Sequence, residues 1–168
     1  MIEAIFNTEQ MISVDEGNLE YLKEQASKAP RKRFRLCLHH STNARVNEMI
    51  IAFSRETYNR PHRHPIDKTE SYHIISGEMK VFIFDDSGHV SSHIQLGERG
   101  SGHPFLFHME GGIWHMPFPE SEFVVTHETF TGPFQRDIDV EFAPWSPEEK
   151  NDSEVQTFLI RCLKMTSS

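Results

Sequence analysis

A succession of short segments with alternating apolar and polar residues is the feature that most limits the fold of this 168-residue chain. The segments read VNEMIIAFSR, SYHII, MKVFIFD, HIQL, PFLFH and EFVVTHETF, and they are separated by SGE, DDSG, GERGSG, MEGG and PFPES. The separators are rich in Gly, Pro, Asp and Ser, which tight turns require. Many short strands without helical segments between them predict an antiparallel β-barrel or a double sheet.

Helical periodicity is confined to the two ends of the chain. Residues 15–29 place apolar side chains at helical spacing before Pro30, and PEEKNDSEVQTFLIRCLK does so near the C-terminus. We therefore expect a mainly β fold in three parts. These are an N-terminal helical extension (1–30), a β-barrel (31–142) and a C-terminal helical segment (143–168).

Composition narrows the class of protein. Hydrophobic residues make up 37% of the chain and charged residues 25%, which predicts a packed core rather than disorder. The start, MIEAIFNTEQ, lacks the pattern of a secretory signal, and no stretch approaches about 20 apolar residues, so we expect a cytoplasmic protein without a membrane partner. A net charge of -8 argues against nucleic-acid binding. The two cysteines, far apart, indicate neither a disulfide framework nor a thiolate zinc site.

The stretch RPHRHPIDKTESYHIISG, residues 60–77, concentrates metal-binding side chains. His62 and His64 are two residues apart, so a strand places both on one face, about 6.5 to 7 Å apart. The intervening PIDKT is long enough to reverse the chain, and Glu70 can then begin a neighbouring strand beside the two histidines. Alternation along that strand turns Glu70 and Tyr72 inward and His73 outward, so His73 is not expected to be a ligand.

A fourth ligand must come from a more distant strand. Of the five histidines between Gly77 and the last strand, His115 is the best placed, because it follows the glycine turn in EGGIWH. Three imidazoles and one carboxylate form a site of borderline hardness that suits one divalent transition metal, namely Fe, Mn, Zn, Ni or Co. In an octahedral shell such a site leaves two positions for water, dioxygen or substrate oxygens.

Arginine side chains gather on and near the same segments. Arg33, Arg35 and His39 alternate with apolar residues from Phe34 onward, which is the usual pattern of a solvated strand face. The alternative is a site for an anionic small-molecule substrate, because Arg binds carboxylate or phosphate through paired hydrogen bonds. Arg60 and Arg63, which flank the two histidines, favour the second interpretation, and both remain open. Cys37 lies on the same face and is expected to be a packing residue.

Three residues are candidates for catalytic proton transfer. Tyr72 shares the inward face with Glu70, and Tyr58 precedes the histidine pair. Glu128 follows His127 on the strand after His115, and only one of these two adjacent side chains can point inward.

These residues resemble the motifs of a known family. The pattern H-x-H, five residues, Glu, six residues, Gly resembles the first cupin motif, and G-x-x-H at Gly112 to His115 resembles the core of the second. The resemblance implies a cupin-type jelly roll with His62, His64, Glu70 and His115 as metal ligands. RKRFRLCLHHS, NEMIIAF, ESYHIISGEM, FDDSG and HETFTGPF further resemble the WbuC family of cupin-fold metalloproteins, over roughly residues 30–136.

The resemblance implies a role in polysaccharide or O-antigen biosynthesis without a defined reaction, and cupin pairing through an edge strand implies a homodimer. Three hypotheses follow. The protein is an isomerase- or epimerase-like enzyme acting on a sugar or sugar nucleotide, an Fe(II)-dependent oxygenase, or a non-catalytic cupin that binds a small ligand. The sequence leaves the metal, the substrate and the reaction class open.

Overall fold

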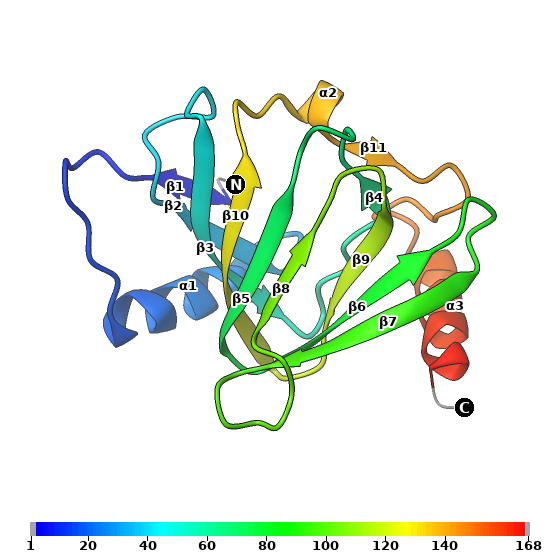
Figure 1. The fold of residues 1–168 in the computed structure, drawn as a ribbon. Coiled ribbons are helices and arrows are strands. Elements are labelled where there is room, and N and C mark those ends of the chain that lie inside the picture. Colours follow the sequence, from blue (N-terminus) through cyan, green and yellow to red (C-terminus); the bar gives the residue numbers. More distant parts are fainter. Residues whose placement is uncertain (1–2, 167–168) are drawn as a thin grey trace.

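Two facing β-sheets form the body of the protein in a computed structural model, which describes residues 3–166 (Figure 1). The first sheet has the order β1 (Ala4–Phe6), β2 (Arg33–Cys37), β3 (Val46–Ser54), β10 (Phe123–Thr131), β5 (Glu70–Ser76) and β8 (Leu106–Met109). The second has the order β11 (Glu141–Phe142), β4 (His62–Arg63), β9 (Trp114–Pro119), β6 (Glu78–Phe84) and β7 (Val90–Gly97). Three helices accompany them: α1 (Glu16–Lys28), α2 (Arg136–Asp139) and α3 (Asp152–Met165). The mainly β fold with a helix near each end is therefore confirmed.

Three elements were not predicted from the sequence. They are β1, which pairs in parallel with β2, and the short pieces α2 and β11 between β10 and α3. Each has only two to four residues, which is too short to show a period of 2 or 3.6.

Strand β9 continues where the sequence predicted a turn at PFPES. The strand runs through Pro117 and Pro119, which pair with Val81 and Met79 of β6. On its other side, β9 pairs with β4 only at His115. Beyond that point β9 has the character of an edge strand, where the missing N–H of a proline is tolerated.

Helix α1 decides which face of β2 points inward. Asp15 caps the helix by accepting from the backbone N–H of Asn18 at 3.1 Å, and the Asn18 side chain accepts from the N–H of Asp15 at 2.9 Å. The helix then packs Leu19, Leu22 and Ala26 against Phe34 and Leu36 of β2. Because α1 covers the apolar face of β2 from outside, the opposite face of the strand, with its arginines, points into the space between the sheets.

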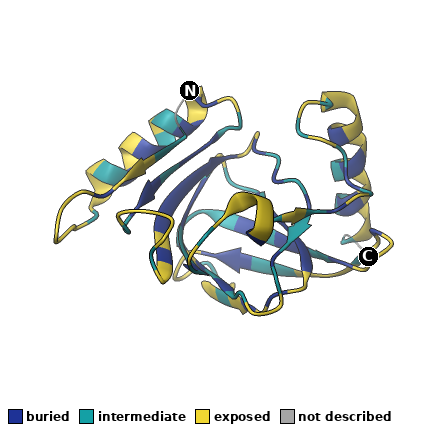
Figure 2. Ribbon diagram, turned by 90° about the horizontal axis from the view of Figure 1, so that it is seen from above, coloured by how far each residue is buried: buried dark blue, intermediate teal, exposed yellow. Residues whose placement is uncertain are grey.

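Helix α3 covers the outer face of the second sheet at the opposite side of the molecule (Figure 2). Its buried stripe of Val155, Phe158 and Cys162 lies over aromatic residues of β6 and β9. Burying a large apolar side chain contributes about 1.5–3 kcal/mol, so this contact fixes the C-terminal segment to the sheet. Within residues 3–166 no helix combines the length and apolar character needed to cross a membrane.

Candidate metal centre

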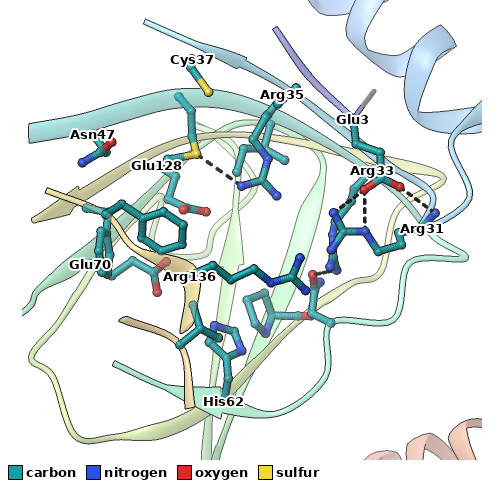
Figure 3. Close-up of a pocket in the computed structure, with 18 of the residues that line it drawn as sticks. Glu3, Arg31, Arg33, Arg35, Cys37, Asn47, His62, Glu70, Glu128 and Arg136 are labelled. Carbon is teal, nitrogen blue, oxygen red and sulfur yellow. Dashed lines mark hydrogen bonds and ion pairs between the residues drawn. The ribbon is translucent and has the colours of Figure 1, made fainter. Parts of the chain in front are cut away.

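A cavity of about 460 Å³ lies between the two sheets (Figure 3). It is at the end of the molecule where β4, β11 and α2 come together in Figure 1. Its walls come from β2, β3, β5 and β10 of the first sheet and from the segments around β4 and β11. The volume is in the range of about 300–1,000 Å³ that is usual for sites of small molecules.

Three histidines converge at this cavity. His62 on β4 is the register partner of His115 on β9, and His64 follows two residues after His62. A ligating ring nitrogen from each of the three lies within 4.8 Å of the others. Such a group of imidazoles on two adjacent strands can bind a transition metal.

The hydrogen bonds of these rings orient them for a cation. The Nδ1 atom of each lies at hydrogen-bond distance from a backbone carbonyl oxygen, which can only accept, so Nδ1 carries the proton. The acceptors for His62, His64 and His115 are Arg60, Asp139 and Ile113, at 2.9, 2.6 and 2.9 Å. The Nε2 atoms of His64 and His115 are buried without a hydrogen-bond partner. Leaving a buried acceptor unpaired is costly, and a metal bound at these atoms would remove that cost, so the donor set fits the metal that cupins hold.

Glu70 reaches the histidines from the opposite sheet. Its Oε2 atom lies 3.3 Å from Nε2 of His115 and 3.6 Å from Nε2 of His64. Tyr72 donates a 2.6 Å hydrogen bond to the same oxygen. The expectation that Glu70 begins a strand beside β4 is wrong, because β5 lies between β10 and β8 in the first sheet. The carboxylate therefore approaches the three imidazoles across the cavity rather than along one sheet.

The charges of Glu70 and His62 suit a metal site, whereas the neighbouring Glu70 carboxylate raises the pKa of His64 against the effect of burial. Burial alone would raise the pKa of Glu70, but nearby His115 and His64 outweigh it and hold that pKa well below its usual range. Burial, together with the other two imidazoles, lowers the pKa of His62 well below its ordinary value. A carboxylate and a neutral imidazole are the forms that bind a metal.

The glycine turn of EGGIWH explains how two distant ligands meet. The N–H of Gly112 donates to the carbonyl oxygen of His64 at 2.8 Å. A Cβ atom on Gly111 would lie 1.8 Å from the carbonyl oxygen of Pro65, so only glycine permits this approach. The turn thus holds the chain after His64 against the start of β9, which carries His115.

Glu128 is the inward residue of the His127 and Glu128 pair. It lines the cavity, whereas Nε2 of His127 lies 3.6 Å from the Glu48 carboxylate on the other face of the sheet. Burial and the negative charge of Glu70 raise the pKa of Glu128 to about 8. Its surroundings therefore favour the protonated form of this carboxyl group.

The two tyrosines named as proton-transfer candidates differ in position. Tyr72 is buried at the cavity, and burial followed by the charges of Glu70 and Glu128 keeps its pKa well above the usual value. Tyr58 does not line the cavity. Its hydroxyl donates to the carbonyl oxygen of Pro147 at 3.1 Å, and its ring packs edge-on against Phe158 of α3. Tyr58 therefore lies outside the site to which the sequence assigned it, because α3 covers its segment.

The alternating pattern of β2 alone suggested that its polar face is exposed to solvent. In the structure this face points into the cavity instead. Arg33, Arg35, Cys37 and His39 all line the cavity. Arg33 is buried and donates to Glu149 at 3.0 Å, and burial lowers its pKa to about 10, which leaves it charged at neutral pH. The guanidinium of Arg35 lies 3.9 Å from the sulfur of Met49. The ring of His39 is half-buried and lies at hydrogen-bond distance from the backbone of Glu48, either accepting from its N–H or donating to its carbonyl oxygen.

The two arginines that flank the histidines behave differently. Arg60 lines the cavity, but its Nε donates to the hydroxyl of Ser146 at 2.9 Å, and the guanidinium lies 5.2 Å from the centre of the Phe142 ring. Arg63 points outward, paired with Glu141 at 2.7 and 3.0 Å. Its predicted place at the substrate is therefore wrong, because the residue between two inward histidines on a strand must face outward.

Arg136 is a charged cavity residue that the sequence analysis missed. Arg136 lies in α2, on the connection between β10 and β11, and its side chain extends into the cavity (Figure 3). The surrounding PFQRDID has no periodicity that separates this arginine from an ordinary surface residue. Only the course of the chain over the end of the sheets reveals its position.

Comparisons with known proteins agree with the fold. Residues 14–96 match a family model described as a domain of unknown function, DUF6016. A search among curated proteins found no relative of this sequence. Among solved structures, protein SO0799 from Shewanella oneidensis is 13% identical, with a TM-score of 0.56 over 83% of this chain and 85% of that one.

Two further structures share the architecture at low identity. Oxalate oxidase in complex with glycolate is 19% identical, with a TM-score of 0.53 over 84% of this chain and 76% of its own. L-ribose isomerase from Cellulomonas parahominis with L-psicose is 17% identical, with a TM-score of 0.52 over 68% of this chain and 70% of its own. At these identities the likeness concerns the fold alone. The protein thus has the cupin fold, and its three-histidine cluster lies at the cavity between the two sheets, which His62 and His64 line.

Proposed function

We propose that this protein is a metal-dependent enzyme that acts on a small anionic and hydroxylated molecule of the sugar or sugar-nucleotide class. One observation carries the proposal. His62, His64 and Glu70 line a cavity of about 460 Å³ together with arginine side chains of β2, and the buried His115 completes the group of three imidazoles beside them. A cation site and anion-binding groups in one cavity of this size suit a ligand that has both oxygen donors and a negative charge.

The residues of the site have distinct roles in this proposal. His62, His64, His115 and Glu70 hold one divalent ion of Fe, Mn, Zn, Ni or Co, which when bound polarises a carbonyl or hydroxyl oxygen. Glu128 faces the cavity beside Glu70 and moves a proton to or from the ligand. Tyr72 donates to Glu70 and so positions that carboxylate.

An isomerase- or epimerase-like reaction fits these roles. Both reactions move a proton at a carbon next to a carbonyl group, and they need one polarised oxygen and one carboxyl group within reach. The resemblance of residues 30–136 to the WbuC family supports a place in polysaccharide biosynthesis of the O-antigen type. Glycolate and L-psicose, bound in two proteins of this fold, are small hydroxylated molecules. A cytoplasmic location and a homodimer remain predictions.

The test begins with elemental analysis of protein purified without added metal. The protein loaded with the metal found is then mixed with sugar phosphates, uronic acids and sugar nucleotides in D2O, and proton NMR follows exchange at carbon. We expect one class to exchange with the wild type, but neither with the metal-free protein nor with Glu128→Gln. If none of these compounds binds in calorimetry or exchanges, the proposal is lost.

An Fe(II)-dependent oxygenase is a second candidate, favoured by the mixed nitrogen and oxygen donors around the three histidines. It predicts oxygen uptake that requires both iron and an added substrate. An oxygen electrode distinguishes the two reactions, since isomerisation consumes no oxygen. Binding with neither exchange nor oxygen uptake would instead indicate a non-catalytic cupin that holds a small ligand.

A further inference from the structure

Most arginines at the cavity already have partners within the protein. Arg31 forms an ion pair with Glu3, Arg33 pairs with Glu149, and Arg60 donates to Ser146. In the part of the chain that the structure describes, no ion pair joins Arg35 or Arg136 to a carboxylate. These two guanidinium groups are therefore the cavity cations that remain available to a ligand.

Both side chains are directed into the same space. Arg35 enters from β2 and Arg136 from α2, on the side of the cavity opposite β4, above His62 in Figure 3. Arg35 lies near Glu128, whose carboxyl it influences electrostatically, and Glu128 in turn contacts Glu70. An anion beside Arg35 would therefore lie close to the metal ligands rather than in a separate pocket.

The position of Arg136 is tied to the metal centre by hydrogen bonds. Asp139 closes the turn of α2 by accepting from the N–H of Gln135 at 2.6 Å, and its own carbonyl oxygen faces Nδ1 of His64 at 2.6 Å. Lys68 donates to the carbonyl oxygen of Pro133 at 2.7 Å and lies 3.7 Å from the Asp139 carboxylate. The same short segment thus orients a metal ligand and carries a cavity cation.

Arg35 is half-buried, so its guanidinium loses part of its hydration without gaining a carboxylate partner, whereas Arg136 is exposed and keeps most of its hydration. A carboxylate or phosphate restores that loss through charge-assisted hydrogen bonds, and the planar guanidinium favours oxyanions with two oxygens to share. The Glu128 carboxyl does not fill this role, because no ion pair joins it to Arg35.

We propose that Arg35 and Arg136 form a clamp for a carboxylate or phosphate group of the ligand, whose hydroxyl or carbonyl oxygens face Glu70 and the three histidines. The inference rests on the proposed function and deepens it. The ligand is an acidic or phosphorylated sugar-like compound, and a neutral sugar of the same size binds more weakly because it leaves both arginines without a charged partner.

Calorimetry with three probes tests the clamp. D-glucuronate carries a carboxylate, D-glucose 6-phosphate carries a phosphate, and D-glucose carries neither. We expect the metal-loaded wild type to bind at least one anionic probe ten times or more tightly than D-glucose, and the better of the two identifies the anion. Arg136→Ala and Arg35→Gln should each weaken that binding about tenfold or more, because each removes a charged hydrogen-bond donor.

Two further variants control the experiment. Arg99→Ala removes the same charge from an exposed turn outside the cavity and should bind the anion as the wild type does. Arg35→Lys keeps the charge but loses the planar fork, and it should bind less tightly than the wild type even if Arg35→Gln fails to fold.

Each outcome decides between the two proposals. If Arg136→Ala and Arg35→Gln fold and bind the anion as tightly as the wild type, the clamp is wrong and the metal-dependent function stands. If anion binding needs both arginines but the protein cannot hold a metal, the clamp stands and the metal-dependent function is wrong. If neither anion binds more tightly than D-glucose, the clamp is overturned.

Discussion

The Nδ1 atom of His64 lies 2.6 Å from the backbone carbonyl oxygen of Asp139, which follows it 75 positions later in the chain. A carbonyl accepts but cannot donate, so this contact places the proton on Nδ1 and leaves Nε2 free for a cation. His62 and His115 are held in the same way, each by a carbonyl two residues before it. The backbone therefore sets the tautomer of all three rings before any metal binds.

Loss of the histidine pair on one strand should abolish metal binding. In the variant with both His62→Ala and His64→Ala, only His115 and Glu70 remain, and two ligands hold a divalent metal far more weakly than four. Elemental analysis after gel filtration should find no bound metal, while the circular dichroism spectrum stays that of a folded β protein.

A matched control changes His89→Ala and His93→Ala, two exposed histidines outside the cavity. That variant should retain the metal content of the wild type. A full equivalent of metal in the His62 and His64 variant would show that the ligand set is wrong.

Lys68 should act on the metal through the segment that it anchors. Replacing Lys68 by Met removes the contacts to Pro133 and Asp139, so the carbonyl that orients His64 is held less firmly. Loss of a group that orients a ligand commonly costs ten- to a hundredfold in metal affinity, and we expect about tenfold for this more distant contact. Competition with a chromophoric chelator measures the change.

The comparison variant is Lys150→Met, which breaks an exposed pair with Glu148. It should leave metal affinity unchanged. Equal affinities for the two variants would mean that the position of Asp139 does not depend on Lys68.

Residue periodicity was sufficient to predict most of the fold but not the environment of each face. The alternation from Arg33 to Cys37 was correct, yet the apolar face lies outward under α1 and the arginine face lines a cavity. A sequence pattern shows that a strand has two faces, whereas the element that covers one of them decides which is internal. The short elements β1, α2 and β11 lacked any period to detect.

The site residues also divide into those that sequence patterns predict and those whose position depends on neighbouring elements. The residues predicted as ligands, His62, His64, Glu70 and His115, do lie together, because strand alternation and the turn residues constrain them; that they bind a metal stays a prediction. Alternation along the strand also explains why the side chain of Arg63 points outward, since its neighbours His62 and His64 point inward. Arg136 had no such signal, since its place depends on how residues 132–140 cross the end of the sheets.

The two cysteines should be unreactive in the folded protein. Burial, as the largest cause, raises the pKa of Cys37 and of Cys162 to about 11. At pH 8 only about one molecule in a thousand carries either thiolate, so alkylation by iodoacetamide should be slower than for a free thiol by about a hundredfold or more. Mass spectrometry follows the labelling, with urea-unfolded protein as the reference.

The raised pKa of the two thiols also makes the stability of the protein depend on pH. Because the folded pKa of both thiols exceeds the unfolded one, their contribution to stability is complete below about pH 9 and is lost as the pH rises toward about 11. Rapid alkylation of Cys37 at pH 8 would contradict its assignment as a packing residue and make it a candidate functional thiol.

Arg33 should prove to be a structural residue, in contrast to Arg35 on the same face of β2. Its guanidinium is buried, bonds to the Tyr58 carbonyl at 3.1 Å and pairs with Glu149, which joins β2 to the segment before α3. Removing one partner of a buried pair costs about 3–5 kcal/mol. Because Glu149 is partly exposed, we expect Arg33→Met to lower the free energy of unfolding by about 2–3 kcal/mol in urea titrations, and Glu149→Gln to lower it less. A stable Arg33→Met that fails to bind the anionic probes would instead place Arg33 among the ligand-binding residues.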